Sequence, residues 1–212
     1  DEHFMRMGFY KSMVNQYLTN TNGNTRADLL PMLHNVKRFS PNAISFPLTK
    51  DSKPIFKLDQ IVPENGFSHK AHDAMGDVIG TIEMAKLIKE RCPDIWNVAT
   101  NHSNKQEVMS RADQLPAFCY GFYNKYRDPE FGVYALMGFN RSEKNKNEML
   151  VFDLTKDPDD FDILTIEESM KLVRKKDSPF KVIKANESPV LLPYNLAPLI
   201  EEDVDENIIM ER

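Results

Sequence analysis

The chain has 212 residues, 41% of them hydrophobic and 28% charged, as in globular proteins of one large domain or two small ones. No apolar run approaches the roughly 18 residues of a membrane span, no signal peptide opens the sequence and its two cysteines form no disulfide framework, which together predict a cytoplasmic protein. The net charge of −5 argues weakly against nucleic acid as a ligand, but a local basic groove is not excluded, because binding depends on where the charges lie.

The first segment has the apolar spacing of a helix already in progress. Apolar residues recur at helical intervals from Phe4 to Tyr17. Because a domain rarely begins inside a helix, we expect the sequence to be a fragment of a longer protein. A polar loop over residues 19–25 follows, and Asp28 then caps a second helix. Its expected inward-facing residues are Leu29, Met32, Leu33, Val36 and Phe39.

Prolines predict an irregular segment over residues 40–53, followed by a short helix over 56–61 that ends at the Pro63–Gly66 break. A longer helix is expected from about Ala74 to Arg91, with Asp73 as its N-cap. The apolar positions that carry this prediction are Met75, Val78, Ile79, Ile82, Ala85 and Ile88.

The start of that long helix carries a histidine and a carboxylate. His72 and Asp77 would point about 140° apart if both were helical, but they can converge if His72 lies in the entering loop. Such a pair suits phosphodiester hydrolysis, because a carboxylate can hold a divalent cation while an imidazole deprotonates the attacking water. The alternative interpretation is that Asp73 and Asp77 only complement the helix dipole, with His72 an ordinary loop residue.

The segment Ala71-His-Asp-Ala-Met-Gly-Asp77, with the residues that follow to Lys89, resembles the third motif of the exodeoxyribonuclease I family. That family belongs to the Asp-Glu-Asp-Asp-His superfamily of 3′–5′ exonucleases, which have a ribonuclease H-like fold. Residues 1–10 are similar to the second motif, with Asp1 as its acidic residue. The first motif, an Asp-x-Glu that supplies two metal-binding carboxylates, is absent. We therefore expect the isolated 212-residue chain to be inactive as a nuclease.

The resemblance implies hydrolysis of single-stranded DNA from its 3′ end, with release of 5′-mononucleotides, in DNA repair and recombination. It implies His72 as general base, and Asp1 and Asp77 as ligands of two Mg²⁺ ions, with Mn²⁺ as the alternative ion. Its implied partners are single-stranded DNA and single-stranded DNA-binding protein, and the expected state is a monomer. The implied DNA-binding residues are Arg6, Tyr17, Lys57, Lys105, Asn147, Lys181 and Asn186.

Beyond Pro93 we expect one more helix, from Asp94 to about Arg111, and then a change to alternating patterns. Aromatic and β-branched residues predict strands over 117–123, 131–139 and 149–154, with a polar hairpin tip over 141–147. Thr165 and Glu168 form a capping box for a helix to about Lys176, and a strand is expected over 179–186. The tyrosines at 120, 123, 126 and 134 could stack on bases, although alternating aromatics in strands are more often core.

The predicted fold class is α/β plus β. By the resemblance, residues 1–111 form the C-terminal, helical portion of a ribonuclease H-like exonuclease domain together with a connecting helix. Residues 112–200 form a Src-homology-3-like, DNA-binding β-barrel with an inserted helix, and 201–212 start a truncated C-terminal region.

Two other functions remain open from the sequence. The adjacent His72 and Asp73 are also found in the all-helical histidine-aspartate metal phosphohydrolases. Those enzymes need further histidines on other helices, and the remaining histidines lack such contexts. The second alternative is a non-catalytic module that binds single-stranded DNA.

Overall fold

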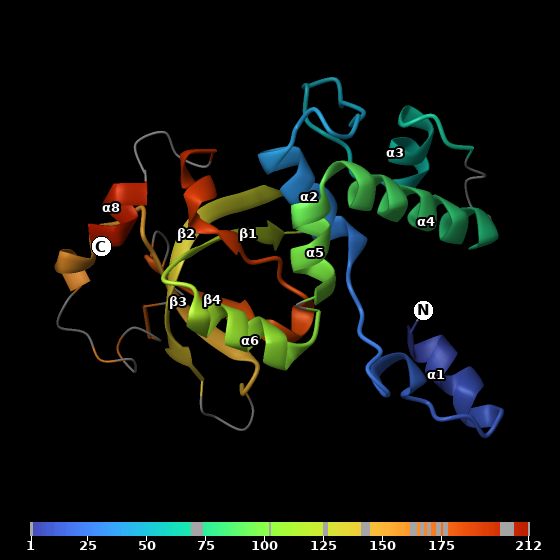
Figure 1. Cartoon of the computed structure of the whole chain (residues 1–212), viewed down its shortest axis with the longest axis horizontal. Helices are drawn as coiled ribbons and strands as arrows, with labels where there is room; N and C mark the ends of the chain where they lie inside the picture. The colour runs from blue at the N-terminus through green and yellow to red at the C-terminus, as the bar shows by residue number, and fades with distance from the viewer. Residues whose placement is uncertain are drawn as a thin grey trace.

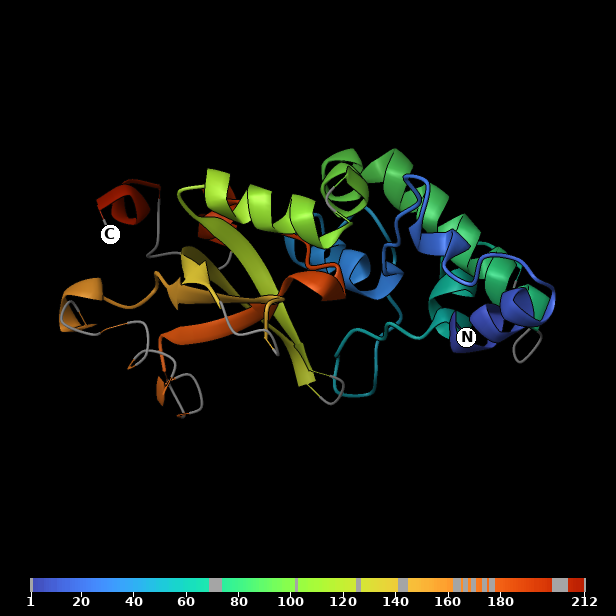
Figure 2. The ribbon, with the colours of Figure 1, turned by 90° about the horizontal axis from the view of Figure 1, so that it is seen from below.

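The computed structural model describes residues 2–68, 74–101, 103–124, 127–140, 145–161, 165, 168, 171–172, 175, 178–199 and 206–211. These residues form a helical region towards one end of the longest axis and an antiparallel sheet towards the other (Figure 1). The N-terminal helix lies near the helical end and the C-terminal helix near the sheet end (Figure 2). Within this part of the chain, no helix is long and apolar enough to cross a membrane.

The helical region confirms the predicted succession of helices in its main features. Its helices are α1 (Glu2–Lys11), α2 (Leu29–Phe39), α3 (Leu58–Glu64), α4 (Ala74–Arg91), α5 (Pro93–Asn101) and α6 (Lys105–Gln114), with a 3-10 turn η1 (Leu18–Asn20) after α1. The Asp28 side chain caps α2 as predicted, accepting the backbone N–H of Leu30 at 2.9 Å. The bounds of α4 are those predicted from the apolar spacing.

Three predicted boundaries in this region are wrong. The first helix ends at Lys11, and Met13 then takes a left-handed φ of 55° that cannot continue a helix. The predicted helix from Asp94 is two helices, because the Asn104 side chain turns back to accept the backbone N–H of Glu107 at 3.0 Å and caps α6. Helix α3 runs through Pro63 and ends at Glu64, so that proline does not break it.

The sheet has five strands in the order β4-β3-β2-β1-β5, and all neighbours are antiparallel. The strands are β1 (Phe118–Asn124), β2 (Arg127–Phe139), β3 (Glu148–Asp153), β4 (Phe180–Lys184) and β5 (Leu192–Pro193). The predicted strands are therefore present, but β4 ends at Lys184, and 3-10 helix η3 (Ala185–Glu187) replaces the last predicted strand residues. The architecture is α/β, with one sheet and helices packed on it.

The two faces of the sheet bury two separate apolar clusters, because successive strand residues point to opposite sides. Cys119, Val133 and Leu150 contribute to one cluster together with buried residues of α2, α4 and α5. Their chain neighbours Phe118 and Tyr134 face the other way and pack with Val108 and Ala112 of α6 in the second cluster. Helix α6 thus packs on the face of the sheet opposite the one that buried residues of α2, α4 and α5 cover.

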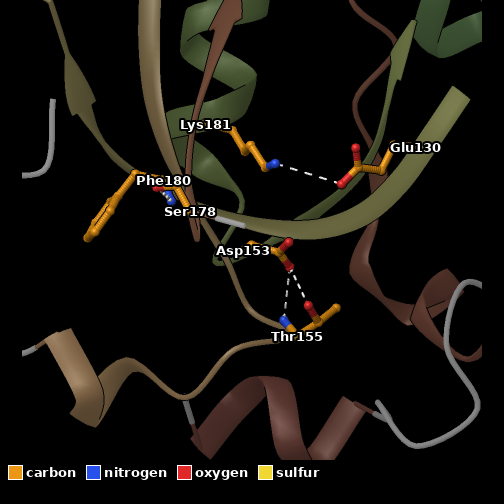
Figure 3. Close-up of polar contacts among 6 residues, drawn as sticks. All are labelled: Glu130, Asp153, Thr155, Ser178, Phe180 and Lys181. Atoms are coloured by element: carbon orange, nitrogen blue, oxygen red, sulfur yellow. Dashed lines mark hydrogen bonds and ion pairs between the residues drawn. The ribbon is translucent and has the colours of Figure 1, made fainter. Parts of the chain in front are cut away.

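A long-range ion pair shows that the sheet curls. Lys181 on β4 lies opposite Val151 on β3, which in turn lies opposite Leu136 on β2. Glu130 is six residues before Leu136, about 20 Å along an extended strand. The Lys181 Nζ nevertheless lies 3.7 Å from the Glu130 Oε1, and the two side chains face each other in Figure 3. The first part of β2 must therefore bend back towards β4.

The segments after β3 contain η2 (Pro158–Phe161), η4 (Tyr194–Leu199) and α8 (Glu206–Glu211). The predicted capping box is confirmed: the Thr165 hydroxyl donates to the Glu168 carboxylate at 2.7 Å, and the Glu168 backbone N–H donates back to that hydroxyl at 3.3 Å. The hydrogen bonds that the Thr165 hydroxyl and the Thr165 backbone N–H donate to the Glu168 carboxylate lower the pKa of that carboxyl. The remainder of the predicted helix lies largely outside the described residues, as do residues 141–144 of the hairpin tip.

Candidate nucleic-acid interface

The predicted catalytic pair is only partly described. Asp77 lies exposed in the first turn of α4, where its backbone carbonyl accepts the Thr81 hydroxyl at 2.8 Å. His72 and Asp1 lie outside the described residues, as does the predicted N-cap Asp73, so their placement beside Asp77 stays a prediction.

Among the residues that the structure describes, no three histidine, cysteine, aspartate or glutamate side chains gather closely enough to hold a metal ion. Asp77 is the one member of the predicted ligand set within that part of the chain, and a single carboxylate supplies fewer oxygens than Mg²⁺ requires. The described residues therefore do not make a complete metal centre by themselves.

Two predicted DNA-binding residues near the N-terminus meet each other. The guanidinium carbon of Arg6 on α1 lies 5.1 Å from the centre of the Tyr17 ring, within the range of a cation–π contact. Helix α1 stands apart from the sheet in both ribbon views (Figures 1 and 2).

Lys57 is exposed and immediately precedes α3, where its backbone carbonyl accepts the N–H groups of Gln60 and Ile61. Its chain neighbours Phe56 and Leu58 both line a large cavity. Lys57 thus lies between two residues that line the cavity.

This large cavity, of about 940 Å³, lies between the N-terminal half of α2, the β1–β2 hairpin and the segment 182–190. Its wall carries aromatic side chains from three parts of the chain: Phe56, Tyr120, Phe122 and Phe131, together with the His34 ring, which stacks on Phe56 with ring centres 4.0 Å apart. A cavity of this size is in the range of ligand sites, and aromatic walls suit flat rings such as nucleobases.

Tyr120 belongs both to the core and to this wall. Its ring packs edge-to-face on Phe122 at 4.8 Å, and burial together with the charge of Glu187 raises the pKa of its phenol to about 12. From its place in an alternating strand pattern, this tyrosine is predicted to pack in the core. The structure confirms the packing and also places Tyr120 at the edge of the large cavity.

A second cavity, of about 430 Å³, is lined, among the residues that the structure describes, by polar side chains: Asn24, Thr25, Arg26, Ser103, Asn104, Lys105, Asn186 and Ser188. Arg26 and Lys105 bring positive charge to it, and none of these residues is acidic. The structure therefore brings Lys105 and Asn186, two predicted DNA-binding residues far apart in the sequence, to one cavity. Anions are the ligands that such a set of side chains favours.

The remaining predicted residues lie on neighbouring strands. Asn147 precedes β3, and its backbone carbonyl accepts the N–H of Ala185 at 2.8 Å, which places it beside the chain at Asn186. Lys181 is half-buried on β4 and paired with Glu130, as described above. Asn147 therefore lies beside a residue that lines the second cavity, and Lys181 lies on the strand that leads to it.

Arg26 is the main residue that sequence reasoning missed. It lies in a polar turn segment, where a single arginine has no pattern to distinguish it from solvated surface. In the structure Arg26, Asn186 and Ser188 line both cavities, and the Ser188 hydroxyl donates to the Arg26 backbone carbonyl at 3.3 Å. Only the pairing of two segments far apart in the chain gives Arg26 this position.

Comparison with known proteins identifies relatives over almost the whole chain. No protein-family model matches it. The curated "Exodeoxyribonuclease I" of Haemophilus influenzae is 30% identical over 91% of this chain, and that of Escherichia coli is 30% identical over 97%. The chain is thus similar in sequence to part of these two exonucleases. It spans 44% and 45% of the length of these two relatives.

Solved structures of exonuclease I agree with the sequence relatives. The E. coli exonuclease I in complex with a dA16 oligonucleotide matches 100% of this chain and 48% of its own, with 25% identity and a TM-score of 0.74. An ExoI/SSB-Ct complex matches with 25% identity and a TM-score of 0.73. The enzyme of Methylocaldum szegediense is 24% identical with a TM-score of 0.74, and its likeness shows the shared fold.

Proposed function

We propose that this chain is the single-strand-binding part, with a portion of the active site, of an exodeoxyribonuclease I that hydrolyses single-stranded DNA in the 3′ to 5′ direction and acts in DNA repair and recombination in the cytoplasm. The observation that carries the proposal is the match of the whole chain to exonuclease I bound to an oligonucleotide. The meeting of Lys105 and Asn186 at one polar cavity supports it from the geometry of this protein.

In the proposed arrangement, residues 1–111 complete an exonuclease domain of ribonuclease H-like fold, and 112–200 form the Src-homology-3-like domain, with 201–212 leading into a further region. The curl of β2 towards β4, seen in the Lys181–Glu130 pair, supports a barrel-like second domain. Aromatic and cationic residues at the two cavities would bind the strand between the helical region and the sheet.

The proposed chemistry is hydrolysis at the 3′ end. Asp77 and Asp1 would be among the residues that hold Mg²⁺ or Mn²⁺, which when bound would supply positive charge at the scissile phosphate. His72 would accept a proton from the attacking water, a role that suits a group that titrates near neutral pH. Arg6, Tyr17 and Lys57 would hold the strand near its 3′ end, and Lys105, Asn147, Lys181 and Asn186 would hold it further along.

A test of catalysis uses the chain extended at its N-terminus by the segment that carries the first motif of the family. We expect magnesium-dependent release of mononucleotides from the 3′ ends of single strands, and loss of about two orders of magnitude or more in His72→Ala and Asp77→Ala. Asp94→Ala is the matched control, because Asp94 is also an exposed carboxylate in the first turn of a helix. Full activity in both site variants would overturn the proposed site.

The second candidate function is a non-catalytic module for single-stranded DNA, and the observation in its favour is that Lys105 and Asn186 line one polar cavity. Binding without cleavage by the extended chain would establish that candidate. A preference of the 212-residue chain for duplex over single-stranded DNA in fluorescence anisotropy would contradict both.

The second proposed partner, besides single-stranded DNA, is the C-terminal peptide of single-stranded DNA-binding protein, because one of the matching structures is a complex of exonuclease I with that peptide. We propose that this chain binds such a peptide as a monomer. Anisotropy of a labelled peptide, with and without a competing oligonucleotide, would measure that binding separately from DNA.

A further inference from the structure

The wall of the large cavity contains an ion pair between two residues close together in the chain. The Lys184 Nζ lies 3.0 Å from the Glu187 Oε1, and the ammonium donates a hydrogen bond to that carboxylate. Both residues line the cavity, and their side chains are 52% and 64% exposed. A ligand that enters the cavity from solvent can therefore reach both charges.

The local backbone sets the position of this pair. Lys184 is the last residue of β4, and the chain then turns through η3. The Ala185 N–H donates to the Asn147 carbonyl at 2.8 Å, which holds the start of the turn beside the sheet. Ser188, just after the turn, takes a left-handed φ of 52°. Glu187 is thereby brought back beside Lys184 in the cavity wall.

The Glu187 carboxylate affects two neighbouring side chains. Its hydrogen bond raises the pKa of the Lys184 ammonium. Burial and then the charge of Glu187 raise the pKa of the Tyr120 phenol, which lines the same cavity. The positive charge of Lys184 is thus matched by an anion before any ligand binds. Exposed ion pairs contribute little to stability, because water solvates both charges, so an incoming anion can replace the carboxylate.

A phosphate of a single strand is such an anion. We propose that Glu187 competes with the strand for the Lys184 ammonium and thereby limits the affinity of this protein for single-stranded DNA. The proposal rests on the proposed function, and it adds a residue that acts against binding. A strand that advances after each cleavage needs contacts that exchange readily, and a carboxylate within reach of the ammonium allows that exchange.

The test is the salt dependence of single-strand binding by the 212-residue chain. Fluorescence anisotropy with a labelled oligothymidylate of about ten nucleotides is measured over a range of salt concentrations. Each phosphate contact on a single strand contributes about 0.7 to the slope of log K against log salt. Because Glu187→Gln frees the ammonium, we expect a slope steeper by up to about 0.7 and an affinity higher by about threefold to tenfold.

Two further variants make this result specific. Glu83→Gln removes the carboxylate of another pair with the same spacing, Glu83 with Lys86 at 2.8 Å on α4, and neither residue is among the described residues that line the two cavities. It changes the net charge equally and should leave slope and affinity unchanged. The double variant Lys184→Gln/Glu187→Gln has no ammonium to release, so its slope should be no steeper than that of the wild type.

The outcomes separate this proposal from the proposed function. If neither the wild type nor Glu187→Gln binds single strands, the proposed function is overturned and the competition with it. If the wild type binds and Glu187→Gln has the same slope and affinity, only the competition is overturned. An equal gain in Glu83→Gln would also overturn it, because net charge alone would explain the result. A steeper slope that persists in the double variant would show that Lys184 is not the cation released.

Discussion

The two ends of this molecule differ in how far their large apolar side chains are buried. In the sheet both faces are covered, and the large side chains of Phe118, Tyr134 and Phe180 are almost completely buried. At the other end, large apolar residues are exposed on α1 and on one side of α4: Phe4, Met5, Met7, Tyr10, Met75, Val78, Ile79 and Ile82. Apolar side chains at helical spacing therefore show that a helix forms, but not that its apolar face is buried.

The burial of apolar side chains indicates which part of this chain contributes most to its stability. Apolar area that stays in contact with water contributes little to the free energy of folding, whereas each large side chain removed from water contributes about 1.5–3 kcal/mol. We infer that the sheet and the helices packed directly on it hold the fold together. The same substitution should then have unequal consequences at the two ends.

The largest expected effect is from truncation of a buried ring. Phe180 is 1% exposed and packs edge-to-face on Phe152 with ring centres 5.4 Å apart. Phe180→Ala should lower the free energy of unfolding by about 3–5 kcal/mol, because it removes apolar contacts and leaves a cavity. Phe4→Ala, at a ring that is 84% exposed, should change it by no more than about 0.5 kcal/mol. Urea unfolding of the purified chain measures both, and a large loss in Phe4→Ala would show that α1 is packed in solution.

A second pair of substitutions should change the stability of the protein in opposite directions. A Cβ at Gly132 would lie 2.5 Å from the Tyr134 hydroxyl oxygen, and the buried ring cannot move away. Gly132→Ala should therefore destabilise the protein by about 1–3 kcal/mol. Gly8 in α1 has no atom within 4 Å of the corresponding position, so Gly8→Ala should favour the helix by up to about 1 kcal/mol. Thermal unfolding would report the two shifts, and stabilisation by Gly132→Ala would refute the close approach of the Tyr134 ring.

The smallest expected effect concerns the alkaline limit of stability. The pKa of Tyr120 is raised to about 12 in the folded protein, against about 10 in an unfolded chain. Between these values the unfolded chain loses the phenolic proton while the folded chain retains it, so stability falls as the pH rises from about 10 to about 12. In Tyr120→Phe this fall should be smaller by no more than about 2.7 kcal/mol, as measured by urea unfolding at successive pH values.

Tyr10→Phe is the control for the alkaline measurement, because it removes an exposed phenol at the other end of the molecule. An unchanged pH profile in Tyr120→Phe would mean that the Tyr120 phenol is accessible to water. Tyr134 stays in both variants, and burial raises its pKa as well, so the decline with pH should be reduced but not abolished.

Much of the local structure followed from the sequence alone. The bounds of α4, the Asp28 cap and the Thr165–Glu168 capping box all depend on residues close together in the chain, and all three are confirmed. The break before α6 was missed, because the choice of Asn104 as a cap in place of a continuous helix depends on what the flanking helices pack against. The alternating patterns predicted the strands, but not the order in which the strands pair in the sheet.

The candidate site shows the same division. The sequence, through its resemblance to a known family, selected Lys105 and Asn186, and the structure brings them to one cavity. It did not select Arg26, since a lone arginine in a polar turn carries no pattern. The placement of His72 and Asp1 beside Asp77 stays a prediction.

Local patterns predict where most helices and strands form, because hydrogen bonding and side-chain periodicity act over a few residues. Which apolar faces are covered, how far the sheet curls and which distant polar residues share a cavity depend on tertiary packing. Those features depend on contacts between segments separated by up to 162 residues, such as that between Ser188 and Arg26. A pattern within one segment does not show which distant segment packs against it. The two cavities could therefore be identified only in the folded chain.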